Sequence, residues 1–166
     1  MTKTVAQTNL TEAFWDSIDS LLGPISFGVD TDERVVGLTF TRLDPRAMRA
    51  PDRCRTVRRQ LEEYFSGART SFDLELAPVG TAFQQRVWKG LTEIPFGEAW
   101  GYGQLATHIG KPRAARAVGQ ANGRNPIPVI IPCHRVIAAD RSIGGFSSGL
   151  PIKRQLLTLE HIEIAA

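Results

Sequence analysis

Short runs of apolar and polar residues alternate through the first half of the chain. The segments 23–29 and 35–40 contain β-branched residues and enclose a polar turn, so we predict a β-hairpin. Residues 71–77 place apolar side chains at every second position, which is typical of a half-buried strand. Residues 1–22 show no clear period and read as a loosely specified lead-in. The strands of this half are therefore expected after residue 22.

A helix is predicted between these strands. Residues 42–53 are rich in Arg, Pro and Asp and read as a loop. Residues 54–65 then carry apolar side chains on one helical face, and Gly67 ends the helix. The segment from Arg46 to Arg59 holds six arginines, for which a solvated face is the simplest interpretation. The first half is predicted to be a small α+β unit.

The second half opens with a helix signal. A Pro-Val-Gly turn precedes Thr81 and Gln84, whose spacing predicts a capping box at a helix start. Apolar residues recur at four-residue spacing after it, and residues 95–97 end the helix. We therefore divide the chain into domains 1–78 and 79–166.

Two short helices around a Gly-containing turn come next, which is a helix-turn-helix pattern. They are expected at 102–109 and 112–121, with Pro112 tolerated at the first helical position. The remaining predicted elements are an extended apolar segment, a Gly/Ser loop and a last helix, at 128–133, 144–149 and 151–159. The second domain is thus mainly helical.

Composition places the chain among ordinary globular proteins. Apolar residues make up 42% of the 166 positions, which is enough for a packed core. No window approaches the length of about 20 apolar residues that a membrane-spanning helix needs, and the N-terminus lacks the apolar stretch of a secretory signal. Two cysteines do not make a disulfide framework. We expect free thiols in the cytoplasm and no membrane partner.

Charge is distributed unevenly. Residues 1–80 hold 10 Lys+Arg and 12 Asp+Glu, a balance of −2, whereas residues 81–166 hold 10 and 5, a balance of +5. A basic second half is compatible with an anionic partner. By itself the asymmetry is weak, since many unrelated domains show one.

Cys133 and His134 are adjacent, although the chain has two cysteines and three histidines. A nucleophilic cysteine needs a base to take its proton, and a histidine base needs an orienting carboxylate. Glu160 on the last helix is a candidate for that carboxylate. From the dipeptide alone, a buried inert thiol beside an exposed imidazole is the better interpretation. A zinc site is less favoured still, because the other candidate ligands are scattered: Cys54, His108 and His161.

The surroundings of the pair favour the nucleophile. Pro128 and Pro132 restrict the backbone on both sides of the apolar segment, so we expect Cys133 to stand rigidly at its end. The helix-turn-helix pattern precedes this segment directly. A nucleophilic cysteine next to a DNA-reading element is an unusual combination.

The motif PCHRV at 132–136 resembles the signature of the O6-alkylguanine-DNA alkyltransferases, also called methylated-DNA–protein-cysteine methyltransferases. Further segments resemble this family in the same order and spacing: FQQRVWKGLTEIPFGE, YGQLA, KPRAARAVGQANGRNPIPVIIPCHRVI and GGFSSGLPIKRQLLTLE. The resemblance is close over residues 80–160 and weaker in the N-terminal part. It implies an N-terminal ribonuclease H-like domain and a winged-helix-like C-terminal domain, within an α+β fold.

The resemblance also implies catalytic roles. Cys133 matches the alkyl acceptor, His134 the base that takes its proton through a water, and Glu160 the carboxylate that orients the base. Tyr102 matches the tyrosine that donates a proton to the leaving guanine. Asn125 matches a hinge asparagine between the recognition helix and the active-site segment. Outside the family, Tyr102 and Asn125 would read as a helix-start aromatic and a turn residue.

Further positions match the DNA surface and the guanine pocket. Arg116 matches the arginine that fills the gap left by the flipped nucleotide. The other positions expected at the minor groove are Ala114, Ala115, Arg113 and Gly119, and those expected near the guanine pocket are Ser147, Phe146, Lys153 and Gly149. Phe146 stands where several family members have tyrosine, and Ser148 replaces a common glycine. An unrelated chain would carry most of these residues as ordinary surface or helix-packing positions.

The resemblance implies direct-reversal DNA repair, in which O6-alkylguanine is flipped out of the duplex and its alkyl group passes irreversibly to Cys133 in a single turnover. The expected partner is double-stranded DNA containing O6-alkylguanine, bound through its minor groove by a monomer, with cooperative binding left open. No cofactor and no metal are expected. A DNA-binding regulator whose cysteine senses damage or oxidation is the alternative from another class. Tyr102 and Glu160 favour repair, because a pure binder needs neither.

Overall fold

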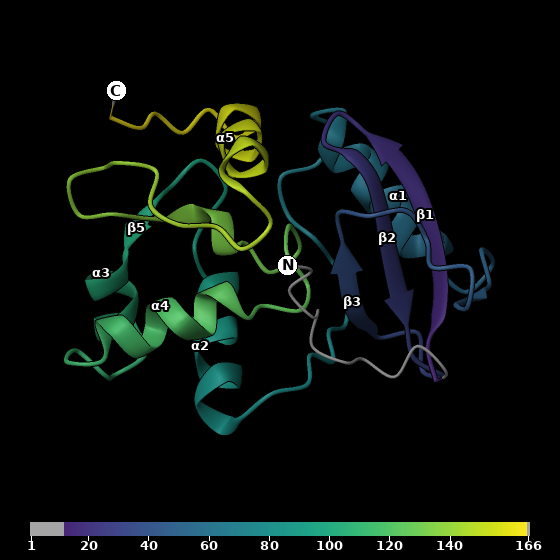
Figure 1. Cartoon of the computed structure of the whole chain (residues 1–166), viewed down its shortest axis with the longest axis horizontal. Coiled ribbons are helices and arrows are strands. Elements are labelled where there is room, and N and C mark those ends of the chain that lie inside the picture. Colours follow the sequence, from purple (N-terminus) through teal and green to yellow (C-terminus); the bar gives the residue numbers. More distant parts are fainter. Residues whose placement is uncertain (1–11, 166) are drawn as a thin grey trace. The chain divides into compact units, whose positions relative to one another are not determined.

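The computed structural model describes residues 12–165, and the chain divides into two compact units between Val79 and Gly80 (Figure 1). The first unit combines a small sheet with one long helix, and the second is mainly helical. The α+β fold class predicted from the sequence is confirmed. The ribonuclease H-like assignment of the first domain stays a prediction.

The sheet of the first unit has four strands in the order β3-β2-β1-β4. Strands β1 (Phe14–Ser20), β2 (Gly23–Val29) and β3 (Val35–Thr39) are antiparallel neighbours, so the predicted hairpin of β2 and β3 is confirmed. The short strand β4 (Met48–Arg49) pairs in parallel with the start of β1, inside a segment predicted as loop.

Strand β1 corrects the interpretation of residues 1–22 as a lead-in. Residues 1–11 lie outside the described part of the chain, but Phe14–Ser20 is a central strand of the sheet. The Trp15 ring covers its neighbour across the hairpin, because a Cβ added to Gly28 would lie 2.8 Å from that ring. Glycine at position 28 therefore makes room for Trp15, and the pattern of β1 alone does not show this need.

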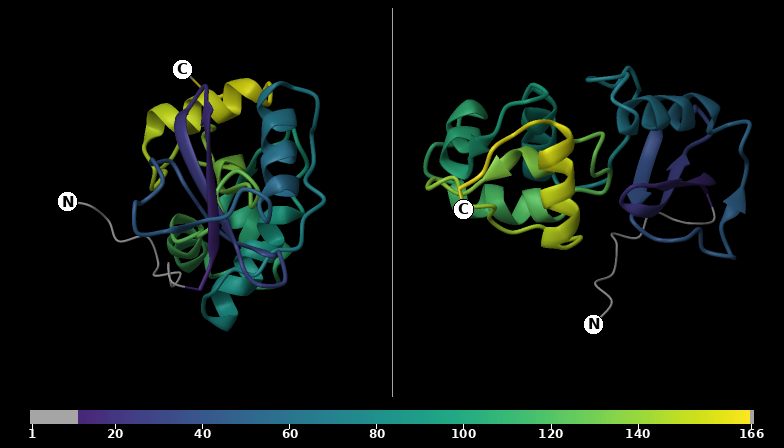
Figure 2. Two further views of the ribbon diagram at one scale, coloured as in Figure 1. Left: turned by 90° about the vertical axis from the view of Figure 1, so that its right-hand side faces the viewer. Right: turned by 90° about the horizontal axis from the view of Figure 1, so that it is seen from above.

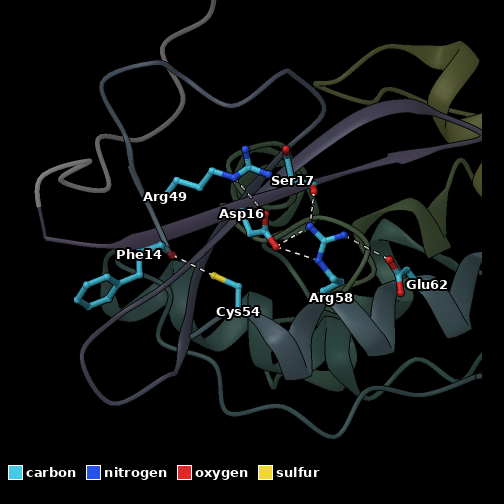
Figure 3. A network of polar contacts seen from close by, with 7 residues as sticks. All are labelled: Phe14, Asp16, Ser17, Arg49, Cys54, Arg58 and Glu62. Carbon is cyan, nitrogen blue, oxygen red and sulfur yellow. Dashed lines mark hydrogen bonds and ion pairs between the residues drawn. The ribbon is translucent and has the colours of Figure 1, made fainter. Parts of the chain in front are cut away.

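Helix α1 (Arg55–Phe65) lies across one face of the sheet (Figure 2). Its buried side chains include Val57, Leu61 and Tyr64, as the helical period predicted. A polar contact joins the helix to β1: the guanidinium of Arg58 donates to Oδ2 of Asp16 from Nε at 2.9 Å and from a terminal nitrogen at 2.6 Å (Figure 3). Asp16 is fully buried, so this ion pair balances a charge inside the unit.

The arginines of segment 46–59 mostly meet partners within their own unit. Arg46 pairs with Asp44, Arg55 with Asp52, and Arg59 with Glu63. The guanidinium of Arg53 lies 4.4 Å from the centroid of the Phe14 ring. These contacts leave little unpaired positive charge for an anionic partner, which agrees with the interpretation of a solvated face.

Residues 71–77 form less of a strand than their alternation predicted. The segment is bonded to β3 at one point only, where the Val35 amide donates to Glu75 and the Ala77 amide donates to Val35. Phe72, Leu74 and Leu76 are nonetheless half-buried and alternate with exposed residues. The period correctly indicated the buried face but not the hydrogen bonding.

Three helices form the body of the second unit: α2 (Ala82–Thr92), α3 (Tyr102–His108) and α4 (Ala115–Gly123). Helix α2 begins at the predicted capping box, in which the side chains of Thr81 and Gln84 each accept a hydrogen bond from the other residue's backbone amide. The indole of Trp88 in α2 donates to the Ala121 carbonyl in α4 at 2.9 Å. A buried hydrogen bond thus joins the two helices.

Helix α4 begins three residues later than predicted. Residues 112–114 form a turn in which the Ala114 amide donates to the Lys111 carbonyl, and the first helical residue is Ala115. Arg113 and Ala114 therefore precede the helix instead of lying on it. The pair α3–α4 keeps the predicted helix-turn-helix order.

The unit is completed by a two-stranded parallel sheet and a last helix. Strand β5 (Trp100–Gly101) pairs with β6 (Val136–Ile137), which places the start of α3 beside the segment that follows Cys133. Helix α5 (Leu150–Leu159) is capped at its C-terminal end by Glu160. No helix within residues 12–165 is long and apolar enough to cross a membrane.

The contact between Asp16 and Arg58 predicts a stability effect. Replacing Arg58 with Met leaves a buried carboxylate without its main cation, and removing one member of a buried pair costs about 3 kcal/mol or more. Urea unfolding should therefore shift to a lower midpoint in Arg58→Met. Arg55→Met is the matched control, because the Arg55–Asp52 pair is exposed on both sides and should move the midpoint little. Equal midpoints for the two variants would contradict this account.

Candidate active site

A compact turn, not an extended segment, presents Cys133. The Ile131 amide donates to the Ile127 carbonyl at 2.9 Å, and the Cys133 amide donates to the Ile131 carbonyl at 2.8 Å across Pro132. Cys133 then opens the 3-10 helix η1 (Cys133–Arg135). The expectation of a straight apolar run is therefore wrong, because local bonds fold the chain back on itself between the two prolines.

The turn includes an unfavourable backbone conformation at Val129. Its φ of 74° lies in the left-handed region, where a β-branched side chain clashes with its own backbone. Such a conformation costs roughly 1–3 kcal/mol and persists only where the surrounding structure imposes it. Here the imposing structure is a fully apolar setting, since Ile127 to Ile131 are all buried.

Two asparagines hold the turn against helix α4. The Asn125 side chain donates to the Ile131 carbonyl at 2.7 Å and accepts from the Ile127 amide at 2.9 Å, so it bridges the turn. The Asn122 amide group donates to the Cys133 carbonyl at 3.4 Å. Asn125 therefore bridges the turn, while its role as a hinge stays a prediction, and Asn122 was missed in the sequence.

A buried carboxylate links His134 to Arg135. Oε1 of Glu160 lies 2.8 Å from Nε2 of His134, and the Arg135 guanidinium donates to both Glu160 oxygens at 2.8 Å. Arg135 also donates to the Ile94 carbonyl at 2.6 Å. His134 and Glu160 have no exposed surface. The return of Glu160 to His134 proposed from sequence is present in the structure.

The charges of this network follow from its contacts. Burial disfavours an ionised Glu160, but hydrogen bonds from His134 and Arg135 outweigh burial and lower the carboxyl pKa to about 2. Burial lowers the pKa of His134, and the hydrogen bond to Glu160 opposes it only in part. The site therefore holds an anionic Glu160 beside a neutral imidazole.

These charges determine which nitrogen of His134 is the base. A neutral imidazole facing a carboxylate donates through the nitrogen nearest to it, so Nε2 carries the proton. Nδ1 is then the lone-pair nitrogen, and it is buried without a hydrogen-bond partner among the described residues. His134 can therefore accept a proton at Nδ1, and it directly follows Cys133 in the chain.

The Cys133 thiol is protonated at rest. Burial raises its pKa to about 11, although a hydrogen bond from Asn125 and the charge of Lys153 act in the opposite direction. Its side chain is 3% exposed. The thiolate is the nucleophilic form of a cysteine, so nucleophilic attack by Cys133 requires a base that removes this proton.

Tyr102 and Lys153 approach Cys133 from helices α3 and α5. Burial raises the pKa of Tyr102, and the Gly145 backbone partly opposes this through a hydrogen bond to the phenol. Nζ of Lys153 donates to the carbonyls of Val136 at 2.7 Å and Gly145 at 2.9 Å. Both side chains thus bind Gly145 in the loop of residues 144–149.

The other predicted pocket residues lie in this loop and at its end. Phe146 is half-buried, Ser147 is exposed, and Gly149 directly precedes α5 with a φ of 103°. The place of Ser147 in a guanine pocket stays a prediction.

The predicted DNA-binding residues gather at α4 and the turn before it. Arg113 and Arg116 are exposed, while Ala114, Ala115 and Gly119 are half-buried. A Cβ added to Gly119 would lie 3.5 Å from the Tyr102 ring, so this glycine adjoins Tyr102. The structure therefore brings Gly119 to the site and leaves the two arginines facing solvent.

Two polar residues of the site were not identified from the sequence as functional, Arg135 and Asn122. The available signal was an arginine inside an apolar run, since a buried arginine requires an acidic partner. Within residues 12–165 no cluster of three or more His, Cys, Asp or Glu side chains has the arrangement of a metal site. The site therefore combines the thiol of Cys133 and the imidazole of His134 with two side chains that carry protons, Tyr102 and Lys153.

Comparison with known proteins agrees with this geometry. Residues 82–162 match the family model described as "6-O-methylguanine DNA methyltransferase, DNA binding domain". A methylated-DNA–protein-cysteine methyltransferase of Methanosarcina barkeri is 50% identical over 153 residues, covering 89% of this chain and 96% of the relative. One of Mycobacterium tuberculosis is 46% identical over 148 residues, covering 87% and 90%.

Solved structures give the same answer. The crystal structure of Mycobacterium tuberculosis O6-methylguanine methyltransferase has a TM-score of 0.81 at 43% identity and covers 89% of this chain and 92% of its own. A structure of the Mycobacterium tuberculosis protein in complex with DNA has a TM-score of 0.82 at 44% identity, with the same coverage. The chain therefore belongs to the methylated-DNA–protein-cysteine methyltransferase family.

Proposed function

We propose that this chain repairs O6-alkylguanine in double-stranded DNA by transferring the alkyl group to Cys133. The observation that carries the proposal is the buried hydrogen bond between His134 and Glu160, because Cys133, the only cysteine of the second unit, directly precedes His134 in the chain. Family membership supports the substrate, since the relatives are named for methylated DNA and a protein cysteine.

The transfer balances without a cofactor. The thiol proton passes to Nδ1 of His134, directly or through a water, and the Sγ electron pair forms a bond to the alkyl carbon. The bond from that carbon to guanine O6 breaks, and its electron pair enters the guanine ring. Tyr102 supplies a proton to the ring, which leaves as guanine. The phenolate and the imidazolium then return to neutrality by proton exchange, and Cys133 remains as a thioether.

DNA binding belongs to helix α4. A base inside a duplex must leave the stack to reach a buried thiol, which costs a few kcal/mol. We place α4 in the minor groove, where its small residues allow close approach and recognition depends little on sequence. Arg116 fills the vacated stack and Arg113 contacts phosphate. Ala114 provides no side-chain cap for the first amides of α4, and we propose that these amides bind a phosphate.

The reaction consumes the protein. Water does not cleave the thioether under cellular conditions, and the sequence has one other cysteine that could take the alkyl group. The other cysteine, Cys54, is buried in the first unit, where its Sγ donates to the Phe14 carbonyl at 3.3 Å and burial raises its pKa to about 12. We propose a monomer that acts once, in the reducing setting of the cytoplasm where both thiols stay free.

Stoichiometry tests this function. With duplex DNA containing O6-methylguanine in tenfold excess, repair should stop at one lesion per protein, and the peptide containing Cys133 should gain the mass of one methyl group. Cys133→Ser should bind the DNA without repairing it, because a serine hydroxyl is a far poorer nucleophile. Cys54→Ser is the matched control and should repair normally. Sustained turnover, or transfer to the Cys133→Ser protein, would refute the proposal.

Arg116 should matter for duplex DNA only. In Arg116→Ala the vacated stack is no longer filled, so the flipping cost of a few kcal/mol is not offset and repair of duplex DNA slows strongly. Reaction with the free base O6-methylguanine involves no flipping and should be nearly unchanged. Arg124→Ala, which removes an exposed arginine beyond the end of α4, serves as the control. An equal loss on both substrates would assign Arg116 to folding or to the pocket.

A further inference from the structure

The segment of residues 161–165 leaves helix α5 in a fixed direction. His161 has a left-handed φ of 59°, and its amide donates to the Thr158 carbonyl at 3.1 Å. The Ile162 amide donates to the Leu157 carbonyl at 2.9 Å, which completes a Schellman motif, and the side chains of these two residues share one buried cluster. The chain therefore reverses immediately after the C-cap of α5, the residue that supplies the carboxylate of the site.

The reversed segment is bound to a tight turn that follows β6, at residues 138–142 (Figure 1). The Arg141 guanidinium donates to the Glu163 carbonyl at 2.8 Å, and the Ala165 amide donates to the Arg141 carbonyl at 2.9 Å. Arg141 has a left-handed φ of 64°, which is uncommon for a residue other than glycine. This pair of hydrogen bonds, the Arg141 clamp, holds segment 161–165 against the turn.

Apolar packing extends the clamp toward the reactive site. Side chains of β6, α5 and both clamped segments share one apolar cluster: Ile137, Leu157, Ile162, Ile143 and Ile164. Ile143 directly precedes the loop of residues 144–149. A Cβ added to Gly144 would lie 3.5 Å from the Ala138 amide nitrogen and 3.3 Å from the phenol oxygen of Tyr102. The loop therefore begins against the clamped turn and beside Tyr102.

We propose that the Arg141 clamp is a positioning device for the guanine, because it fixes loop 144–149 relative to the end of α5. The inference rests on the proposed function, since it assigns this loop to the guanine that α4 delivers. The cap of α5 carries Glu160, and the loop is bound at Gly145 by Tyr102 and Lys153. The clamp joins these two parts of the site without using a catalytic side chain.

A displaced loop changes how the guanine is seated but leaves the thiol as it is. Transfer requires the alkyl carbon in line with Sγ of Cys133, and a misplacement of about 1 Å can slow a reaction by about a hundredfold. Iodoacetamide is small and needs no seat for a guanine, so its reaction reports on the thiol alone. The affinity for undamaged duplex DNA reports on α4. These readouts together separate the seating of the guanine from a general structural role.

The experiment compares the full chain with a chain that ends at Ile162. The shortened chain lacks both hydrogen bonds of the clamp but keeps the Schellman motif, so α5 and Glu160 should stay in place. Its reaction with the free base O6-methylguanine, followed by the mass of the Cys133 peptide, should be slower by about tenfold or more. Carbamidomethylation of Cys133 by iodoacetamide and the affinity for undamaged duplex DNA should remain close to those of the full chain.

A point variant tests the clamp without shortening the chain. Arg141→Asn removes the donor to Glu163 and keeps the left-handed φ, because asparagine adopts this conformation readily. It should slow the free-base reaction by a smaller factor than the shortened chain does, since the hydrogen bond from Ala165 remains. Glu163→Ala is the matched control and should react at the full rate, because the clamp uses the backbone carbonyl of Glu163 and not its carboxylate.

Full-chain rates with the free base in both the shortened chain and Arg141→Asn would overturn the proposal. Equal slowing of the free-base and iodoacetamide reactions, together with weaker DNA binding, would also overturn it, because that pattern marks a general loss of structure. No reaction of the full chain with O6-methylguanine, either free or in a duplex, would refute the proposed function and this inference with it.

Discussion

Glu160 carries a full negative charge although it has no exposed surface, and His134 and Arg135 stabilise this charge through hydrogen bonds. Arg135 stabilises the negative charge of Glu160 more than His134 does, because Arg135 is permanently cationic and binds both carboxylate oxygens. The carboxylate in turn requires a proton on the facing nitrogen of His134. A buried ion pair thereby determines which imidazole nitrogen is free to act on Cys133.

The rest of the second unit positions Glu160 at one end of this hydrogen-bond network and the segment from Cys133 to Arg135 at the other. Helix α5 ends at Glu160, while a strained turn and η1 present Cys133, His134 and Arg135. Val129 has a positive φ in that turn, which the burial of its apolar neighbours and the side-chain bonds of Asn125 offset. Local strain is therefore stored close to the reactive thiol, as is common where a site demands a fixed geometry.

Sequence patterns predicted elements whose signals are local. The capping box at Thr81 and the one-sided apolar faces of α1 and α5 depend on spacing within a few residues, and the structure contains them. Strand β1 was missed because Asp16 interrupts its apolar pattern, and the partner that makes a buried aspartate acceptable, Arg58, lies 42 residues away. The turn before Cys133 was misread for a similar reason, since two prolines in an apolar run are compatible with both an extended segment and a folded one.

The residues of the site show the same division between signals that are local in the sequence and contacts between distant residues. A motif located Cys133 and His134, but sequence alone did not establish that Glu160 reaches His134, or that Lys153 is buried without an acidic partner, because both depend on where α5 packs. The central claim is that burial keeps His134 neutral and that Glu160 holds its one ring proton on Nε2. Nitrogen-15 NMR of histidine-labelled protein at pH 7, with His134 assigned by comparison with His134→Gln, measures this directly. The account predicts an unprotonated Nδ1 and a protonated Nε2, and a proton on Nδ1 would contradict it.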